Sequence, residues 1–435
     1  MRRGSVTRYV AGMPVSRDAK GQLLLGTVPL RQLVDDARWT TPFYAYDLDA
    51  IVAGARSLDR AFGRAPHLVC LAIKANTAGP ILEALGRLGL GADVVSGAEL
   101  SVATRAGIPP ERIVYSGVAK LDAEIDKAIG LGNRGILALQ LESLEEIARV
   151  EARAKASGRT ARVSIRINPS LKRELLSTHD HIATGHDETN FGVPRDDVRE
   201  AVRRVGASPM LNLVGFNFHI GSQLTEVDGY RESAALLCQI AQDAIAGGCN
   251  SLEFLDTGGG FGIDYGSGCS VTPDDFVAVV VREFERTNLG HLTMVVEPGR
   301  AIVGAHGVLV ARTVQTKVAG HCQWIIIDAG MNDLIRPALY QARHRIVPID
   351  DHNGPTESWV VVGPVCESSD DFGAHELPSK APSAVAILDA GAYGFTMASQ
   401  YNGRALPDEL FISNGAVVAV LRGRTSAEWA ASRFA

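Results

Sequence analysis

The sequence predicts an α/β fold, a (β/α)8 TIM-like barrel followed by a C-terminal β-sandwich or β-barrel domain. The first observation is a series of eight apolar, β-rich runs before residue 300, most followed by an amphipathic, helix-like stretch. The runs span residues 67–75, 91–96, 112–117, 135–141, 162–168, 213–219, 252–257 and 292–297. A doubly wound sheet is the alternative, but its usual six strands leave two runs unexplained.

The second observation is where polar residues stand relative to these runs. Those at or near the closing end of a run are Lys74, Asp93, Ser96, Ser116, Arg166, His219, the glycines 258–260 and Glu297. Barrels of this type place their reactive groups at the C-terminal ends of the strands. The coincidence therefore favours a barrel with an active site at that end.

The third observation is a change of pattern beyond Arg300. Strand-like runs at 308–318, 324–328, 359–362, 384–389 and 416–421 follow one another without long helices between them, which indicates a β domain. We therefore expect an N-terminal segment over residues 1–40 that packs with the β domain, a barrel over 41–304, and the β domain over 305–435.

Composition narrows the class of partner. The 435 residues are 46% hydrophobic and carry a formal net charge of -6, which argues against nucleic acid or an anionic membrane and favours a small molecule. No run approaches the roughly 18 apolar residues of a membrane span, and the basic N-terminus lacks the apolar region of a signal peptide. We expect a cytoplasmic protein whose six cysteines, without CxxC pairing, are mostly reduced core thiols.

The stretch from 171 to 212 interrupts the barrel pattern. It carries His179, His181 and His186 among many turn-forming residues and is predicted to be a mobile loop near the barrel mouth. A metal site is the alternative for the three histidines, but ordered ligands usually need strands or helices to hold them. We predict no metal.

Lys74 ends the first apolar run of the barrel. Because burying an ammonium group is costly, a lysine there pairs with an acid, turns outward to solvent, or takes part in chemistry. A desolvated lysine readily forms an imine with an aldehyde, including that of pyridoxal phosphate. Its position at the catalytic end of the predicted barrel favours chemistry.

The last two barrel runs close in distinctive motifs. The stretch 256–262 reads DTGGGFG, whose bare backbone can approach a phosphate, although it lacks the GxGxxG spacing and could be a plain tight turn. The stretch 297–300 reads EPGR and supplies a carboxylate and a guanidinium. A buried carboxylate such as Glu297, facing a pyridine nitrogen, keeps that ring protonated. His219 could stack on such a ring, or it could be a satisfied core histidine.

Together these motifs resemble the fold-type III pyridoxal-phosphate-dependent decarboxylases, the family related to alanine racemase and ornithine decarboxylase. The matching stretches are AIKAN at Lys74, GADVVSGAEL from Gly91, RINP at Arg166, HIGSQ at His219, DTGGGFG from Asp256, EPGR from Glu297, MNDLIRPALY from Met331, GPVCESSD from Gly363 and GAYGFTMAS from Gly391. Each motif alone is weak, but nine in order over almost the whole chain are specific.

The resemblance implies a cofactor, pyridoxal 5'-phosphate, and a residue for each of its parts. Lys74 would hold it covalently, His219 would cover its ring, and Glu297 would pair with the ring nitrogen. The further cofactor-binding residues that the resemblance implies are Asp93, Arg166, Ser222, Gly259, Gly299, Arg300 and Tyr393.

For the substrate, the resemblance implies decarboxylation of meso-2,6-diaminopimelate to L-lysine and carbon dioxide. The implied substrate-binding residues are Arg300, Arg336, Tyr340, Glu367 and Tyr393. Cys366 would supply a proton after carbon dioxide leaves, and it would enter the site from the second subunit of a homodimer with shared active sites. Planar arginines suit carboxylates, and a thiol is a tunable proton donor.

Two departures and two alternatives accompany this interpretation. Asn190 stands where the family generally has lysine or arginine, and residues 402–406 read NGRAL where Asn-Ser-Arg-Pro is more usual.

One alternative is a related decarboxylase of another amino acid, such as a D-amino acid, ornithine, lysine or a carrier-bound acyl substrate. The other is a non-catalytic binding homologue, against which the retention of Lys74, Glu297 and Cys366 speaks.

Overall fold

The computed structural model describes residues 8–9, 15–172, 183–186, 189–266, 268–350 and 354–434. The chain divides into two compact units. Gly54–Ile263 and Ser270–Ala301 form the barrel unit, and Met1–Ala53, Asp264–Cys269 and Ile302–Ala435 form the sheet unit. The boundaries fall inside helix α2 (Leu48–Ala61) and inside the short helix α10 (Arg300–Val303).

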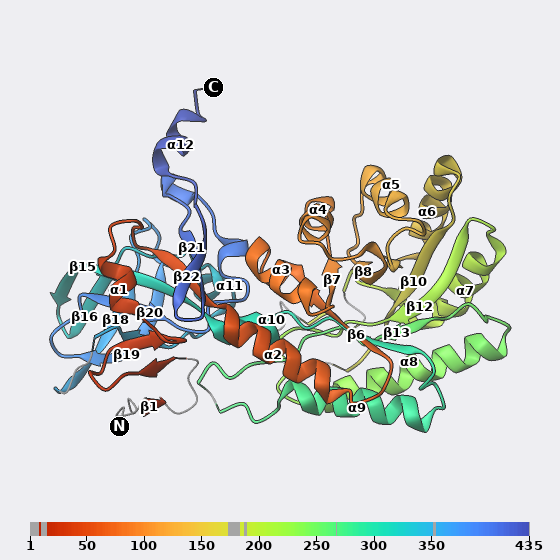
Figure 1. Cartoon of the computed structure of the whole chain (residues 1–435), viewed down its shortest axis with the longest axis horizontal. Coiled ribbons are helices and arrows are strands. Elements are labelled where there is room, and N and C mark those ends of the chain that lie inside the picture. The colour runs from red at the N-terminus through yellow and green to blue at the C-terminus, as the bar shows by residue number, and fades with distance from the viewer. Residues whose placement is uncertain are drawn as a thin grey trace. The chain divides into compact units, whose positions relative to one another are not determined.

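The barrel unit holds all eight predicted strands (Figure 1). They are β6 (His67–Ala72), β7 (Gly91–Val94), β8 (Ile113–Tyr115), β9 (Ala138–Leu141), β10 (Ala161–Asn168), β12 (Leu211–Asn217), β13 (Phe254–Asp256) and β14 (Thr293–Val296). All pair in parallel, and the pairings of β14 with β6 and of β10 with β9 close the ring. The short β11 (Val193–Pro194) adds to the edge of β10. The predicted (β/α)8 barrel is confirmed.

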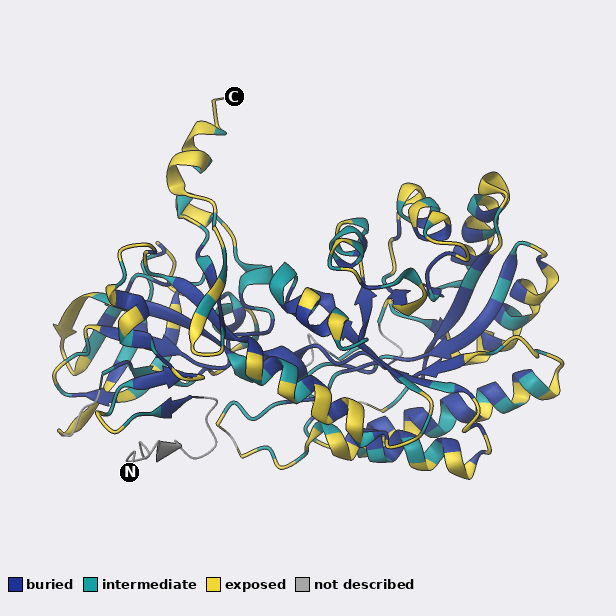
Figure 2. Cartoon of the chain, in the orientation of Figure 1, coloured by how far each residue is buried: buried dark blue, intermediate teal, exposed yellow. Residues whose placement is uncertain are grey.

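Helices cover the outside of these strands, as the sequence pattern predicts. Those of the barrel unit are α3 (Gly79–Arg87), α4 (Gly97–Arg105), α5 (Asp122–Gly130), α6 (Leu144–Ser157), α7 (Val198–Ala207), α8 (Asp228–Ala246) and α9 (Pro273–Arg286). Local signals set their ends: the Ser143 hydroxyl accepts the Glu146 N–H at 3.2 Å, and Gly158 ends α6 in the left-handed conformation at φ 64°. Figure 2 shows their buried faces toward the strands and exposed faces outward.

The stretch 171–212 differs from the predicted loop. It contains β11 and α7, and the apolar side of α7 buries Val198, Ala201 and Val205. Their spacing is helical, but the turn-forming residues around them obscured it in the sequence. His186 is buried and its carbonyl accepts from Asn168 at 2.9 Å, while His179 and His181 lie outside the described residues.

The sheet unit is the predicted β domain. Its strands are β5 (Phe43–Asp47), β15 (Gly307–Ala319), β16 (Cys322–Ile327), β17 (Ile346–Pro348), β18 (Thr356–Val362), β19 (Asp371–Pro378), β20 (Ala384–Ile387), β21 (Asp408–Ser413) and β22 (Ala416–Leu421). The main path runs β19-β18-β16-β15-β5-β21-β22, and β20 joins β15 to β17. A short helix, α11 (Arg336–Tyr340), follows β16.

The domain boundary predicted at residue 41 differs from the grouping seen in the structure. β5 pairs antiparallel with β15 and parallel with β21, so residues through Ala53 group with the sheet unit. The N-terminal strands β1 (Arg8–Tyr9), β2 (Ser16–Arg17), β3 (Leu23–Leu25) and β4 (Val28–Pro29) and the helix α1 (Leu30–Asp35) belong to this unit too. Leu23 and Leu25 are buried in one cluster with Phe43, Val308 and Leu410.

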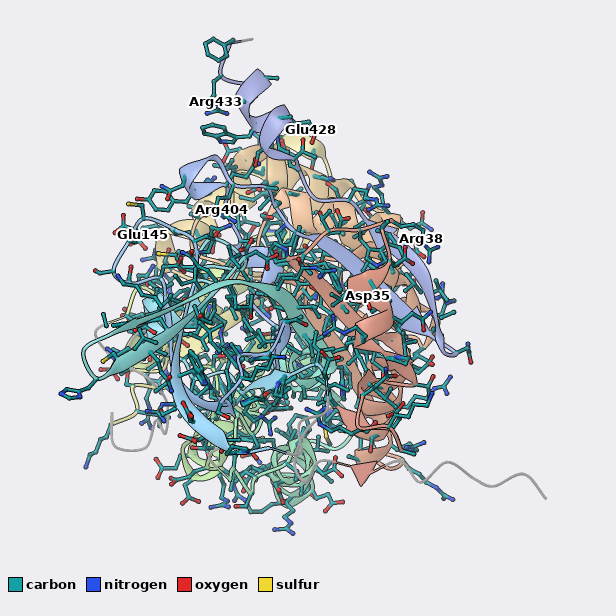
Figure 3. The ribbon with its side chains drawn as sticks, turned by 90° about the vertical axis from the view of Figure 1, so that its left-hand side faces the viewer. Asp35, Arg38, Glu145, Arg404, Glu428 and Arg433 are labelled. Carbon is teal, nitrogen blue, oxygen red and sulfur yellow. The ribbon has the colours of Figure 1, made fainter. Side chains whose placement is uncertain are left out.

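The chain ends in the helix α12 (Ser426–Ala431), which Thr425 and Glu428 cap reciprocally. The Arg433 guanidinium stacks over the Trp429 ring at 5.4 Å, and Figure 3 shows Arg433 and Glu428 on this segment. Among the described residues, no helix is long and apolar enough to cross a membrane.

Candidate active site

Lys74 is paired with a buried acid. β6 ends at Ala72, and a single turn of 3-10 helix, Ile73–Ala75, carries Lys74 just beyond the strand. Its Nζ lies 2.6 Å from Asp93 Oδ2 on the neighbouring β7. The lysine side chain is 33% exposed and the Asp93 side chain 0%. An amine held at the C-terminal end of the barrel by one fixed carboxylate remains open to a ligand.

A hydrogen-bond network continues from Asp93 across the barrel interior. The Ser116 hydroxyl lies 2.6 Å from Asp93 Oδ1 and 2.8 Å from Gln140 Oε1. The Gln140 amide then donates to Asp256 Oδ2 at 3.0 Å and to Glu297 Oε1 at 2.9 Å. The network therefore connects Lys74 to Glu297, the predicted partner of a pyridine nitrogen, through Asp93, Ser116 and Gln140.

Asp256 and Glu297 form a buried pair of acids. Their side chains hydrogen-bond to each other, and their residues are 0% and 4% exposed. Burial raises the pKa of Glu297 well above its usual range, and the charge of Asp256 raises it further. Burial also raises the pKa of Asp256. Two contacting carboxyls in this position hold a proton between them and attract a cationic partner.

His219 follows β12 and is held as a neutral imidazole. Burial lowers its pKa well below the usual range, and the positive charges of Lys74 and Arg166 lower it further. Its Nδ1 accepts the Gly259 N–H at 3.3 Å, and the Thr184 hydroxyl donates to its backbone carbonyl at 2.8 Å. An uncharged ring fixed at one nitrogen is suited to stacking on an aromatic ligand.

Glycine is required at these positions because backbone atoms of neighbouring loops approach them closely. A Cβ at Gly259 would lie 2.0 Å from the Glu297 carbonyl oxygen, and one at Gly260 would lie 2.2 Å from that of Gly221. Gly299 is equally restricted, since its Cβ would lie 2.8 Å from the Ala75 methyl. These contacts bring the loops after β12, β13 and β14 and the turn of Lys74 together at one end of the barrel.

Arg300 and Ser222 form a hydrogen-bonded, positively charged pair in the same region. An Arg300 terminal nitrogen donates to the Ser222 hydroxyl at 2.9 Å, and Arg300 is only 5% exposed. A buried guanidinium beside a hydroxyl is the donor set that binds phosphate or carboxylate. The sequence prediction grouped these two residues only through the family resemblance.

Arg166 is held by an acid that the sequence prediction did not include. Its guanidinium lies 2.8 Å from Glu142 Oε1 and stacks over the Phe191 ring at 4.8 Å. Glu142 also accepts the backbone N–H groups of Gly117 and Gly192, at 3.0 and 2.9 Å. Arg166 is thus fixed by a buried ion pair, and its charge acts on His219 through space.

In the sheet unit, Arg336 opens α11 and is 5% exposed. Its guanidinium lies 2.7 Å from His344 Nε2 and 5.0 Å from the Tyr265 ring centre. His344 Nδ1 contacts the Leu388 carbonyl at 2.9 Å, so Nδ1 carries the hydrogen and Nε2 accepts from Arg336. Tyr340, at the other end of α11, is half-buried.

Cys366 and Glu367 lie on an exposed turn of the sheet unit. The Cys366 N–H donates to Asn402 Oδ1 at 3.0 Å, and the Tyr401 hydroxyl donates to Glu367 Oε1 at 2.5 Å. Tyr393 is half-buried in a left-handed backbone conformation with φ 56°, which is uncommon for a tyrosine. The turn presents a thiol and a carboxylate side by side on the surface of the chain.

Three polar residues of the barrel network were not assigned a role in the sequence prediction. Gln140, Glu142 and Asp256 stand at the ends of β9 and β13, the same kind of position that identified Asp93. That signal could have found them. Ser96 stands at such a position too, but its hydroxyl caps α4 by accepting the Glu99 N–H at 3.2 Å.

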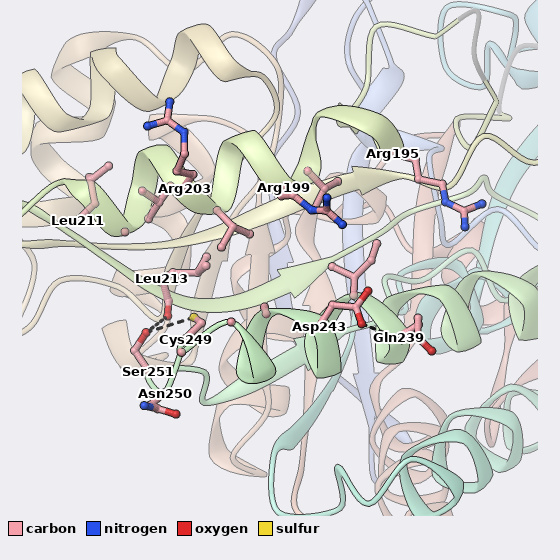
Figure 4. Close-up of a pocket in the computed structure, with 18 of the residues that line it drawn as sticks. Arg195, Arg199, Arg203, Leu211, Leu213, Gln239, Asp243, Cys249, Asn250 and Ser251 are labelled. Atoms are coloured by element: carbon pink, nitrogen blue, oxygen red, sulfur yellow. Dashed lines mark hydrogen bonds between the residues drawn. The ribbon is translucent and has the colours of Figure 1, made fainter.

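A groove of about 1300 Å³ lies elsewhere on the barrel unit, along α7 and α8 (Figure 4). Arg199 and Asp243 line it, and it extends to Leu211 and Leu213, which begin β12, and to Ser251, before β13. It thus reaches the N-terminal ends of these strands, and no predicted site residue lines it. The candidate active site is therefore at the other end of the barrel.

Comparison with known proteins identifies the family of this chain. Residues 48–304 match the family described as pyridoxal-dependent decarboxylase, pyridoxal binding domain. Diaminopimelate decarboxylase from Helicobacter pylori is 40% identical over 393 residues, which cover 90% of this chain and 94% of that protein.

Solved structures give the same result. Helicobacter pylori diaminopimelate decarboxylase complexed with L-lysine superimposes with a TM-score of 0.86 and 37% identity, covering 93% of this chain and 99% of that one. The enzyme from M. jannaschii in co-complex with L-lysine has a TM-score of 0.88 and 30% identity, with 98% and 97% covered. The chain therefore belongs to the pyridoxal-dependent decarboxylase family, in the group of the diaminopimelate decarboxylases.

Proposed function

We propose that this protein decarboxylates meso-2,6-diaminopimelate to L-lysine and carbon dioxide with pyridoxal 5'-phosphate as cofactor. The observation that carries the proposal is similarity over nearly the whole chain to enzymes of that name, together with a barrel mouth that presents Lys74, His219 and Glu297. The two solved relatives named above are complexed with L-lysine, the product of the proposed reaction.

The residues at the barrel mouth fit the cofactor part by part. The Lys74 amine suits the aldehyde, and the neutral His219 ring suits one face of the pyridine. The buried Asp256 and Glu297 pair carries negative charge that a protonated ring nitrogen would balance. Arg300 and Ser222, with the glycine backbone at 259 and 299, form a donor set for the phosphate.

The cofactor supplies an electron sink for the electron pair left when the carboxylate departs. The residues of the chain prepare that step. Asp93 orients the Lys74 amine, and the buried acids would balance the positive charge of a protonated ring nitrogen. His219 shields one face without adding charge. Arg166, fixed by Glu142, contributes positive potential at the same end of the barrel.

We assign the distal groups of the substrate to the sheet unit. The substrate has a carboxylate and an amine remote from the reacting carbon. Arg336 with Tyr340, and Arg300 at the edge of the barrel, suit the carboxylate, and Glu367 suits the amine. We assign Cys366 as the proton donor after carbon dioxide leaves, and Tyr393 as a residue that binds cofactor and substrate. The buried, already oriented Arg336 guanidinium supports this assignment.

We further propose a homodimer in which each active site uses residues from both subunits. The exposure of Cys366 and Glu367 on the single chain supports this, because a proton donor and a substrate ligand need shielding from bulk water. A second subunit covering the turn would provide that shielding. We also propose a cytoplasmic location, because the sequence has six cysteines without CxxC pairing.

Mixing two inactive variants tests the shared site. Lys74→Ala keeps Cys366, and Cys366→Ala keeps Lys74, so a mixed dimer contains one site with both native groups. Random exchange of subunits should restore at most about a quarter of wild-type activity, because half the dimers are mixed and half their sites are intact. The measurement is carbon dioxide release after exchange, with each variant alone as control. Proven exchange without recovered activity would contradict sharing of Cys366.

The substrate is tested by carbon dioxide release from a panel of amino acids. We expect strong preference for meso-diaminopimelate over L-lysine, D-lysine and ornithine, because these three lack the distal carboxylate that would balance the charge of the arginines. Equal or faster turnover of ornithine or D-lysine would refute the assignment. In that case Asn190, which departs from the family pattern, is the first position to exchange.

A further inference from the structure

The strongest unexplained feature is a second buried carboxyl beside Glu297. Asp256 is fully buried at the end of β13, and the proposed function uses it only as part of the charge of the pair, without a role of its own. Among the described residues, it forms no ion pair with a cationic side chain. Its Oδ1 accepts the Gly258 N–H at 2.8 Å, and its Oδ2 accepts the Gln140 amide at 3.0 Å.

The hydrogen bonds distinguish the two acids. Asp256 receives two fixed N–H donors, whereas Glu297, among the described residues, receives one such donor, from Gln140 at 2.9 Å. Donors of this kind stabilise the ionised form of a carboxyl. Asp256 is therefore the member of the pair that keeps its charge, and Glu297 is the more basic member that holds a proton.

The donor between the acids is itself fixed. Gln140 Oε1 accepts the Asn217 amide at 2.9 Å and lies 2.8 Å from the Ser116 hydroxyl, so its amide nitrogen must face the two carboxyls. Gln140 is 1% exposed and Asn217 is 1% exposed. The arrangement holds two acids beside one amide donor where a hydrophobic contact would be less costly, which indicates a use for the charge that Asp256 keeps.

The surrounding charges are accounted for. Asp93 is paired with Lys74 at 2.6 Å, and Arg166 is paired with Glu142 at 2.8 Å. In the part of the chain that the structure describes, neither Asp256 nor Glu297 forms an ion pair, so no side chain there balances the negative charge of this pair. A cation brought by a ligand to Glu297 would be stabilised by both.

We propose that Asp256 is a positioning residue for the cofactor: its fixed carboxylate keeps Glu297 basic enough to retain a proton on the ring nitrogen. Asp256 acts through Glu297 and does not touch the cofactor. The inference rests on the proposed placement of Glu297 at the ring nitrogen, and it is independent of which amino acid is decarboxylated.

The test measures the protonation of the ring nitrogen directly. Wild-type protein and variants are loaded with pyridoxal phosphate that is isotopically labelled at the ring nitrogen, and the nitrogen signal is followed by nuclear magnetic resonance across a pH range. Asp256→Asn should move the ring titration to lower pH by about one unit or more, a tenfold loss of the protonated form. Glu297→Gln should give an unprotonated ring throughout.

A double variant separates charge from packing. In Asp256→Asn the new amide group faces the Gln140 amide, donor against donor, when its oxygen keeps the Gly258 N–H. Adding Gln140→Glu returns an acceptor to that contact and a negative charge beside Glu297. The double variant should regain a protonated ring at neutral pH. Glu146→Gln, a matched change of another buried barrel carboxyl paired with Lys120, should leave the ring titration unchanged.

Each outcome distinguishes the inference about Asp256 from the proposed placement of Glu297. A ring titration that moves in Glu297→Gln but not in Asp256→Asn would overturn the inference and leave the proposed function standing. A titration that moves in neither variant would overturn the placement of Glu297, and the inference with it. Failure of the folded double variant to regain ring protonation would show that Asp256 acts by packing rather than by charge, which also overturns the inference.

Discussion

Lys74→Ala is expected to remove the visible absorbance of the bound cofactor and to lower activity by at least roughly a thousandfold, because the covalent attachment point is lost. The structure adds a stability effect to this result. The variant leaves the Asp93 carboxylate, which is 0% exposed, without its ion pair, so we expect a loss of about 1 to 3 kcal/mol in the free energy of unfolding. Absorption spectra, carbon dioxide release and chemical denaturation measure the three quantities.

Lys74→Arg is the matched variant, because a guanidinium keeps the charge beside Asp93 but does not form the imine. It should be as colourless and inactive as Lys74→Ala while recovering most of the stability. Lys120→Arg makes the same exchange at another buried barrel lysine, paired with Glu146 at 3.0 Å, and should stay coloured. A coloured Lys74→Ala protein after dialysis, with borohydride labelling another lysine, would refute the assignment.

The barrel could be predicted because its signals are local. Each strand is a short apolar run that closes in a polar residue, and each helix carries its own period and caps, as α6 does with Ser143 and Gly158. β5 shows the limit. Its residues Phe43–Asp47 precede the barrel in sequence, but they pair with β15 and β21, more than two hundred residues later. Nothing within the segment specifies that distant pairing.

In the candidate site, too, local features could be predicted from the sequence and long-range contacts could not. Each residue type at a strand end can be interpreted by itself, so the sequence alone predicts roles for Lys74, Asp93 and Glu297. Their connection through Gln140 could not be predicted from the sequence. A lone glutamine in the run Ala138–Leu141 finds its partners, Asp256 and Glu297, only once the fold brings β13 and β14 near it. Exact hydrogen-bond partners depend on side-chain geometry that three converging strands create together.

The second large expected effect concerns substrate choice. Arg336→Ala should lower the preference for meso-diaminopimelate over lysine and ornithine by roughly ten- to a hundredfold, the value of one charge-assisted contact to the distal carboxylate. Cofactor affinity should change much less, since the proposed cofactor contacts are those of the barrel mouth. Ratios of kcat/KM for the three amino acids and the cofactor dissociation constant measure the two effects.

Two variants show whether the effect belongs to the guanidinium of Arg336 itself. Arg336→Lys keeps the charge but loses the planar fork that lies 2.7 Å from His344, so it should retain only part of the preference. Arg345→Ala removes a nearby arginine that pairs with the buried Asp389 at 2.8 Å, and it should lower stability while leaving the preference intact. Were the preference unchanged in Arg336→Ala but lost in Arg345→Ala, the distal carboxylate would have to be assigned to Arg345, because only that arginine would then discriminate a carboxylate from an ammonium group.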